Sequence, residues 1–64
     1  MADYTQQVLR ILSEHGCFFL RRGKGSHKMW YSPLSHRPFT VVDKIGNRHT
    51  ANGILKDAGI KQKV

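Results

Sequence analysis

The sequence predicts an α+β fold of two layers, an α-β-β-β-α sandwich in which two helices cover one face of a three-stranded antiparallel sheet. Apolar residues recur at helical spacing near both ends of the chain, which predicts a helix at each end. Between them lie three short runs rich in aromatic and β-branched residues, separated by turns that contain glycine or proline. A chain of 64 residues has room for one domain with a thin core, so we assign residues 1–64 to a single domain.

The first helix is expected between Asp3 and His15. Asp3 or Thr5 can cap its N-terminus, and Gly16 can adopt the left-handed conformation that ends many helices. Its apolar side chains recur three or four positions apart, at Tyr4, Val8, Ile11 and Leu12.

The three strands are expected at residues 17–22, 27–31 and 39–42. Gly23 and Gly25 turn the chain between the first two strands, and Pro33 marks the turn between the second and the third. Pro38 precedes the third strand, at a position where a missing N–H group is tolerated. Cys17 lies in the apolar run of the first strand and is interpreted as a small buried residue.

Side chains alternate between the two faces of a strand, so Trp30 and Tyr31 should point to opposite faces of the sheet. We expect Trp30 in the core, which places His27, Met29 and Tyr31 together on the other face. An aromatic ring on that face has two interpretations, a stacking contact with a nucleic-acid base or a packing contact with a partner.

The second helix is expected between Thr50 and Ala58, with Thr50 as its N-cap. Gly59 ends this helix, and Ile60 is placed to cover the turn that follows. The apolar stripe that packs on the sheet consists of Ile54, Leu55 and Ala58.

The charge of the chain favours a polyanionic partner. Eleven Lys and Arg residues against four Asp and Glu residues give a formal charge of +7, and a field of this sign favours phosphate-rich molecules through counterion release. Nucleic acid is therefore the first partner to consider, ahead of an anionic membrane surface. Since no segment has the roughly 20 apolar residues that span a bilayer and no signal peptide opens the chain, we expect a cytoplasmic protein.

The segment from Gly23 to His27 is the main candidate site, because it brings an imidazole to the start of the second strand. Imidazole exchanges protons near neutral pH, and cleavage of RNA by its own 2′-hydroxyl requires both proton removal and proton donation. The positions proposed to bind phosphate surround His27 in the sequence: Arg21, Arg22, Lys24, Gly25, Ser26 and Lys28. The alternative is that the segment is an ordinary hairpin turn and that His27 is a polar residue at a strand start.

Three other kinds of site do not fit the residues present. The Gly23 to Ser26 turn lacks the spacing of a nucleotide-binding P-loop and joins two strands rather than a strand and a helix. The remaining histidines and Cys17 have no zinc-like spacing, and the four carboxylates are scattered through the chain. With no order of residues typical of a hydrolytic triad either, we expect cleavage, if present, to need no metal and no cofactor.

Several of these residues together resemble the HicA family of small toxins. The resemblance rests on Gly16 after the first helix, on Gly25-Ser26-His27 before the second strand, and on the closing segment from Thr50 to Ile60. It implies a fold like that of double-stranded-RNA-binding domains and an endoribonuclease of the mRNA interferase type, with His27 as the catalytic histidine. The chain departs from the family pattern in an extra residue before Gly25, in a short loop without proline at residues 43–49, and in His49, where the family often has glycine.

The resemblance also implies a partner, an antitoxin of the HicB type that blocks the active surface of the toxin. Such antitoxins often carry a DNA-binding domain, so contact with DNA would be indirect. A strongly basic toxin suits an acidic or masking partner. The competing interpretation is a non-catalytic RNA-binding module, because the same fold class recognises A-form RNA by its shape and its phosphates.

Overall fold

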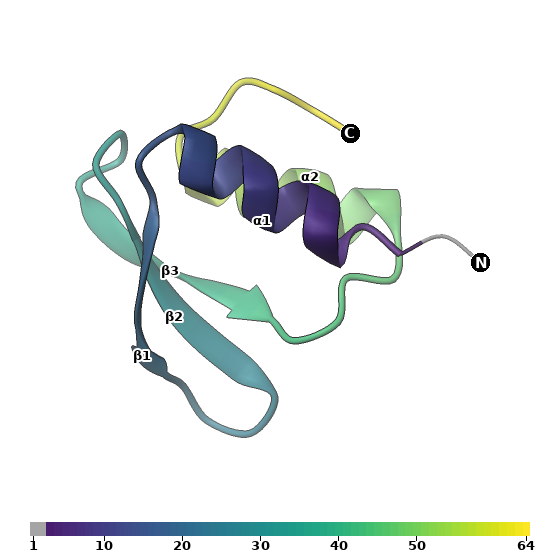
Figure 1. The fold of residues 1–64 in the computed structure, drawn as a ribbon, viewed down its shortest axis with the longest axis horizontal. Helices are drawn as coiled ribbons and strands as arrows, with labels where there is room; N and C mark the ends of the chain where they lie inside the picture. Colours follow the sequence, from purple (N-terminus) through teal and green to yellow (C-terminus); the bar gives the residue numbers. More distant parts are fainter. Residues whose placement is uncertain (1–2) are drawn as a thin grey trace.

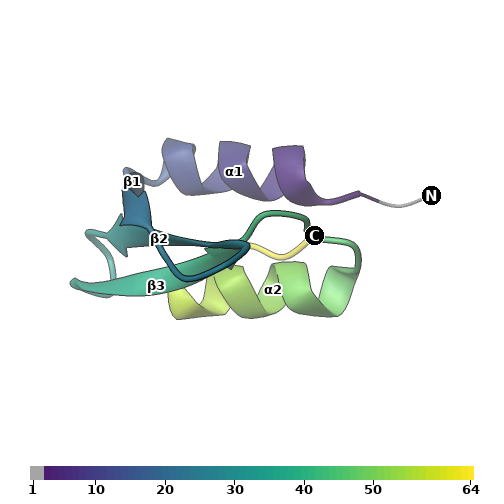
Figure 2. The same cartoon turned by 90° about the horizontal axis from the view of Figure 1, so that it is seen from below.

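The computed structural model describes residues 3–64 and confirms the predicted order of elements. Helix α1 (Thr5–Glu14) is followed by strands β1 (Phe18–Arg22), β2 (His27–Ser32) and β3 (Arg37–Val42) and by helix α2 (Arg48–Asp57). The strands form one antiparallel sheet in the order β1-β2-β3. Both helices lie against the same side of the sheet, with α1 and α2 next to each other (Figures 1 and 2). This is the two-layer, double-stranded-RNA-binding-domain-like arrangement expected from the sequence.

The core lies between the helices and the central part of the sheet. Val8 and Leu12 of α1 and Leu55 of α2 are completely buried, and they meet Phe39 and Val41 of β3. Trp30 packs against this cluster from β2, which confirms the expectation that Trp30 is the member of the Trp30-Tyr31 pair that faces the core. Cys17 is 5% exposed, which confirms its interpretation as a buried residue.

Strand β1 differs from the other two because all of its residues are exposed. Its apolar residues Phe18, Phe19 and Leu20 are 50%, 48% and 45% exposed. Since α2 packs on β3 and β1 contributes no residue to the buried cluster, the helices leave this edge of the sheet uncovered. The run therefore has the composition of a strand but not the burial that its composition favours.

The ends of the elements show which local signals were interpreted correctly. Gly16 and Gly59 have φ angles of 84° and 78°, so both form the left-handed helix ends that the sequence predicted. The N–H group of Ile60 donates to the carbonyl of Leu55 at 2.9 Å, which completes the turn after α2. The predicted N-cap Thr50 was wrong, because α2 begins at Arg48 and the side chain of Asn47 accepts the N–H group of Thr50 at 2.7 Å.

The turn between β2 and β3 is joined to the end of α2 by one buried hydroxyl. Ser32 is completely buried, and its hydroxyl donates to the carbonyl of Ala58 at 2.5 Å. The same oxygen accepts the N–H groups of Leu34 and Ser35, at 3.1 and 3.4 Å. Ser32 therefore holds the last turn of α2 against the far end of the strand that His27 begins.

Neither helix in the described part of the chain has the length and apolar composition of a membrane span.

Candidate functional site

The turn between β1 and β2 has a defined backbone, in which its two glycines have different roles. The N–H group of Gly23 donates to the carbonyl of His27 at 2.9 Å, and the N–H group of His27 donates to the carbonyl of Lys24 at 3.3 Å. Gly25 has a φ angle of 63°, which favours glycine. A Cβ atom at Gly23 would lie 3.3 Å from the carbonyl oxygen of His27, so that glycine permits a close approach. The turn thus sets the position of His27 through its own hydrogen bonds.

The sheet face opposite the helices is called the open face here, and the strand register assigns residues to it. Phe39 and Val41 are buried against the helices, so their neighbours Pro38 and Thr40 lie on the open face. Thr40 is paired with Met29, and the contact of 3.6 Å between its Oγ1 and the Met29 Sδ agrees with this side. The register therefore places the following residues on the open face: Phe18, Arg21, His27, Met29, Tyr31, Pro38 and Thr40. The prediction that His27, Met29 and Tyr31 share a face is confirmed.

An irregularity in β1 brings one arginine to the face of His27. Phe19 is paired with Trp30, but Arg21 is paired with Met29, so Leu20 is an extra residue in β1. Without this bulge Arg21 would face Lys28 and point to the helix side, whereas the bulge turns it to the open face, diagonal to His27. Re-aiming a side chain is a common effect of a β-bulge. Arg21 is thus the cation that the sheet itself aligns with the imidazole.

Two other predicted phosphate-binding residues lie on the opposite side of the same hairpin. Arg22 is paired with Lys28, and both approach the carboxylate of Asp43, at 3.7 Å and 3.8 Å. The N–H group of Asp43 also donates to the carbonyl of Ser26 at 2.8 Å, which ties the turn to the end of β3. Ion pairs at the surface contribute little stability, but Asp43 lowers the net positive charge on this side.

The structure therefore divides the predicted site residues into two groups. His27 and Arg21 lie on the open face, while Arg22 and Lys28 lie beside Asp43. Three of the predicted residues, Lys24, Gly25 and Ser26, lie in the exposed turn between β1 and β2. This turn projects beyond the helices at the bottom of Figure 1.

The other three histidines have different surroundings. The Nδ1 atom of His15 lies 2.8 Å from the carbonyl of Ile11, so this ring is engaged by its own helix. His36 has a φ angle of 59° in the turn before β3, and His49 lies on the exposed side of α2. Among residues 3–64, no three His, Cys, Asp or Glu side chains come together in a way that could hold a metal ion.

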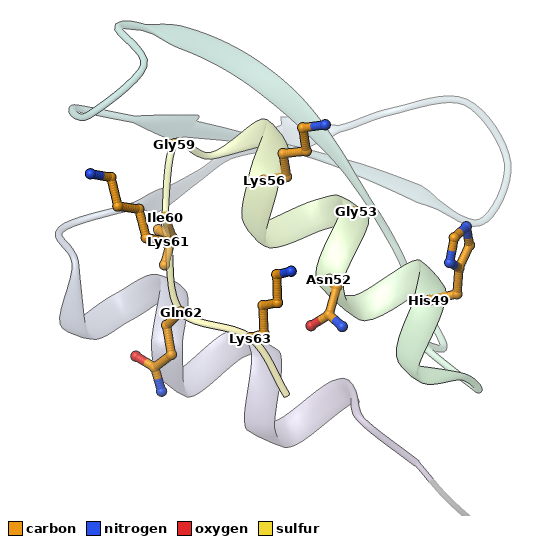
Figure 3. A pocket seen from close by; sticks show the side chains of 9 residues that line it. All are labelled: His49, Asn52, Gly53, Lys56, Gly59, Ile60, Lys61, Gln62 and Lys63. Atoms are coloured by element: carbon orange, nitrogen blue, oxygen red, sulfur yellow. The ribbon is translucent and has the colours of Figure 1, made fainter.

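A second cationic surface lies on the helix layer, away from the hairpin. A groove between α2 and the C-terminal tail carries Lys56, Lys61 and Lys63, with His49 at its end (Figure 3). The tail is held there because the N–H group of Val64 donates to the side chain of Asn52 at 2.8 Å. The groove is separate from His27 and the hairpin turn, so His49 serves below as a control imidazole.

Two residues of the site were not expected from the sequence. Phe18 is the open-face neighbour of Tyr31, a pairing that depends on the register between β1 and β2. Asp43 was interpreted as part of a polar loop, and only the paired strands show that it reaches Arg22 and Lys28.

Comparison with known proteins supports the resemblance drawn from the motifs. A family model described as the HicA toxin of bacterial toxin-antitoxin systems matches residues 5–60, which run from the start of α1 to the residue after Gly59. No curated protein and no solved structure matches the chain.

Proposed function

Because the chain belongs to the HicA toxin family, we propose that it is a metal-independent endoribonuclease, an mRNA interferase that cleaves mRNA in the cytoplasm and so inhibits translation and growth. Family membership makes it the toxin of a toxin-antitoxin pair. The observation that carries the catalytic proposal is the position of His27, exposed on the open face and aligned there with Arg21.

The proposed reaction uses the nucleophile that RNA already contains. The 2′-hydroxyl loses its proton and attacks the adjacent phosphorus, the bond to the 5′-oxygen breaks, and that oxygen takes up a proton. The products are a 2′,3′-cyclic phosphate and a 5′-hydroxyl, so no water, metal or cofactor is consumed. His27 serves as the general acid or the general base of this transfer, because an imidazole can do either near neutral pH.

The cations around the hairpin stabilise the negative charge that develops on the phosphate oxygens. Arg21 lies on the same face as His27, and Lys24 lies in the turn that precedes it. We assign the backbone N–H groups of Gly25 and Ser26, and the hydroxyl of Ser26, to the same phosphate. Lys28 and Arg22 extend the positive surface around the edge of the hairpin, where they bind neighbouring phosphates.

A His27→Ala variant tests the catalytic assignment. We expect loss of RNA fragments in a gel assay that contains EDTA, and loss of growth arrest when the variant is expressed. His49→Ala removes another exposed imidazole, on α2, and serves as the matched control. If His27→Ala cleaves RNA at the rate of His49→Ala, the catalytic role of His27 is refuted.

The alternative function is an RNA-binding module without cleavage, which the charge of +7 and the exposed aromatic residues of β1 also favour. This function predicts salt-sensitive RNA binding without strand scission. In the same EDTA assay, RNA that is shifted but intact supports the binding module, whereas new fragments support the enzyme.

We further propose that the antitoxin is of the HicB type and inhibits by covering the open face and the hairpin turn. Addition of an adjacent open reading frame's product to the cleavage assay tests this proposal. We expect the added protein to bind the wild-type toxin and to inhibit RNA cleavage. The Arg21→Glu variant should bind this protein more weakly, because an acidic partner gains affinity and association rate from complementary charge.

A further inference from the structure

The open face carries an aromatic pair, exposed at Phe18 and half-buried at Tyr31, that the proposed proton transfer does not use. The ring centroids of Phe18 and Tyr31 are 5.5 Å apart, with an angle of 38° between the ring planes. Phe18 is 50% exposed even though it is a large apolar residue. The pair lies on neighbouring strands, because Phe18 and Tyr31 are register partners across β1 and β2.

Packing in the core does not explain this pair. Phe19, the next residue, points to the helix side and meets the ring of Trp30, which packs against the core. Phe18 and Tyr31 are on the opposite side of the sheet, which neither helix covers (Figure 2). Both rings therefore present aromatic surface to the outside of the molecule.

The charges on the open face indicate what kind of molecule binds there. Arg21 and His27 lie on this face. None of the carboxylates in residues 3–64 does, because three are at or next to the ends of the helices and Asp43 is on the other side of the hairpin. A surface that combines cations with exposed rings is typical of proteins that bind single-stranded nucleic acid. In a duplex the base faces are stacked on each other and are not available to a side chain.

We infer that Phe18 and Tyr31 form a stacking subsite for one unpaired base of the RNA strand whose backbone reaches His27. This inference rests on the proposed function for the identity of the strand as RNA. His27 and Tyr31 are four positions apart on β2, which corresponds to about 13 Å along the strand. The subsite therefore holds a base away from the reacting phosphate and selects unpaired over paired RNA. Stacking uses the π-face that every base has, so the subsite accepts any of the four bases.

The test measures RNA binding separately from cleavage. In a His27→Ala background, a single-stranded oligonucleotide carrying 2-aminopurine is titrated with protein that has either the natural residues or Phe18→Leu and Tyr31→Leu. Stacking quenches 2-aminopurine fluorescence, and the double substitution should abolish the quenching and raise the Kd by about 5- to 150-fold. Phe18→Tyr and Tyr31→Phe keep the rings and should retain both signals.

Two controls separate stacking from other effects of the substitutions. Leu34→Ala removes a side chain that is equally exposed, at 48%, and should leave the Kd unchanged. A duplex of the same sequence should bind the natural and leucine variants equally. Thermal unfolding of each variant verifies that it is folded.

The inference is overturned if the leucine variant binds the single strand within twofold of the natural residues. It is also overturned if the leucine variant keeps its RNA affinity and loses only the antitoxin, since the pair is then a protein-docking surface. Failure of the proposed function is distinguishable: a protein with natural residues that binds and quenches the oligonucleotide, but cuts no RNA, refutes catalysis and leaves the subsite intact.

Discussion

Replacement of Ser32 by alanine tests whether one buried hydroxyl joins the sheet to α2. The substitution removes a single oxygen atom and leaves almost no cavity, so the loss of folding free energy comes from the lost hydrogen bonds. The carbonyl of Ala58 lies at the end of α2, where helix carbonyls lack partners within the helix, and it loses the donor that reaches it at 2.5 Å. The N–H groups of Leu34 and Ser35 lose their acceptor as well.

The expected loss of stability follows from how well each group is shielded from water. A buried acceptor without a donor costs about 1 to 3 kcal/mol, and each partly buried N–H group adds about 0.5 kcal/mol. The sum of about 2 to 4 kcal/mol is large, because a domain of this length has a free energy of unfolding of roughly 3 to 10 kcal/mol. The midpoint of thermal unfolding should fall by about 8 to 30 °C.

Urea and thermal unfolding, followed by circular dichroism, measure this difference. Ser35→Ala is the matched control, because the hydroxyl of Ser35 lies in the same turn and makes only a contact of 3.5 Å with the carbonyl of Arg37. We expect its free energy of unfolding to change by less than about 0.5 kcal/mol. If Ser32→Ala unfolds at the same urea concentration as Ser35→Ala, the hydroxyl does not stabilise the fold as argued.

Three further predictions concern the hairpin and the start of α1, two tested by substitutions and one by a pH titration. Arg21→Ala should raise the Kd for RNA about tenfold, whereas Arg22→Ala, beside Asp43, should raise it less than threefold; equal effects in a filter-binding assay would contradict the role of the bulge. Gly25→Ala should cost about 1 to 2 kcal/mol in urea unfolding, because its φ angle is 63° while no atom lies within 4 Å of the added Cβ. Hydrogen bonds from the N–H group and the side chain of Thr5 hold the pKa of the Asp3 carboxyl below 3.8. The ionised carboxylate therefore stabilises the fold above pH 3.8, and this contribution is lost as the pH falls through the lower pKa of the folded state. An NMR titration midpoint of Asp3 at or above 3.8 would refute this.

The order of helices and strands was predictable because its signals are local. Apolar spacing predicted α1, and Gly16 and Gly59 were identified as helix ends from their neighbours alone. The turn at Gly25 and the start of β2 at His27 follow from the same kind of short pattern. Each of these features depends on residues that are close together in the chain.

The details of the candidate site were not predictable, because they depend on contacts between distant residues. The bulge at Leu20 cannot be recognised from the sequence. The run from Phe18 to Arg22 does not alternate between apolar and polar residues, so it does not determine which residues of β1 pair with β2. The hydrogen bond of Ser32 spans 26 positions to Ala58, so no short pattern around Ser32 indicates it. Asp43 comes to Arg22 only through the pairing of β2 with β3.

The small size of the chain explains why its functional groups lie on an open sheet face. A domain of 64 residues can bury only about 60% of the surface of its unfolded chain, and two helices of 10 residues each cover one side of the sheet. The other side must face water or a ligand. Exposed aromatic residues on an edge strand favour association of copies, but the bulge in β1 and the charge of +7 oppose it. The same two features bring Arg21 to the face of His27 and favour a polyanion, so the features that oppose association also contribute to the proposed RNA site.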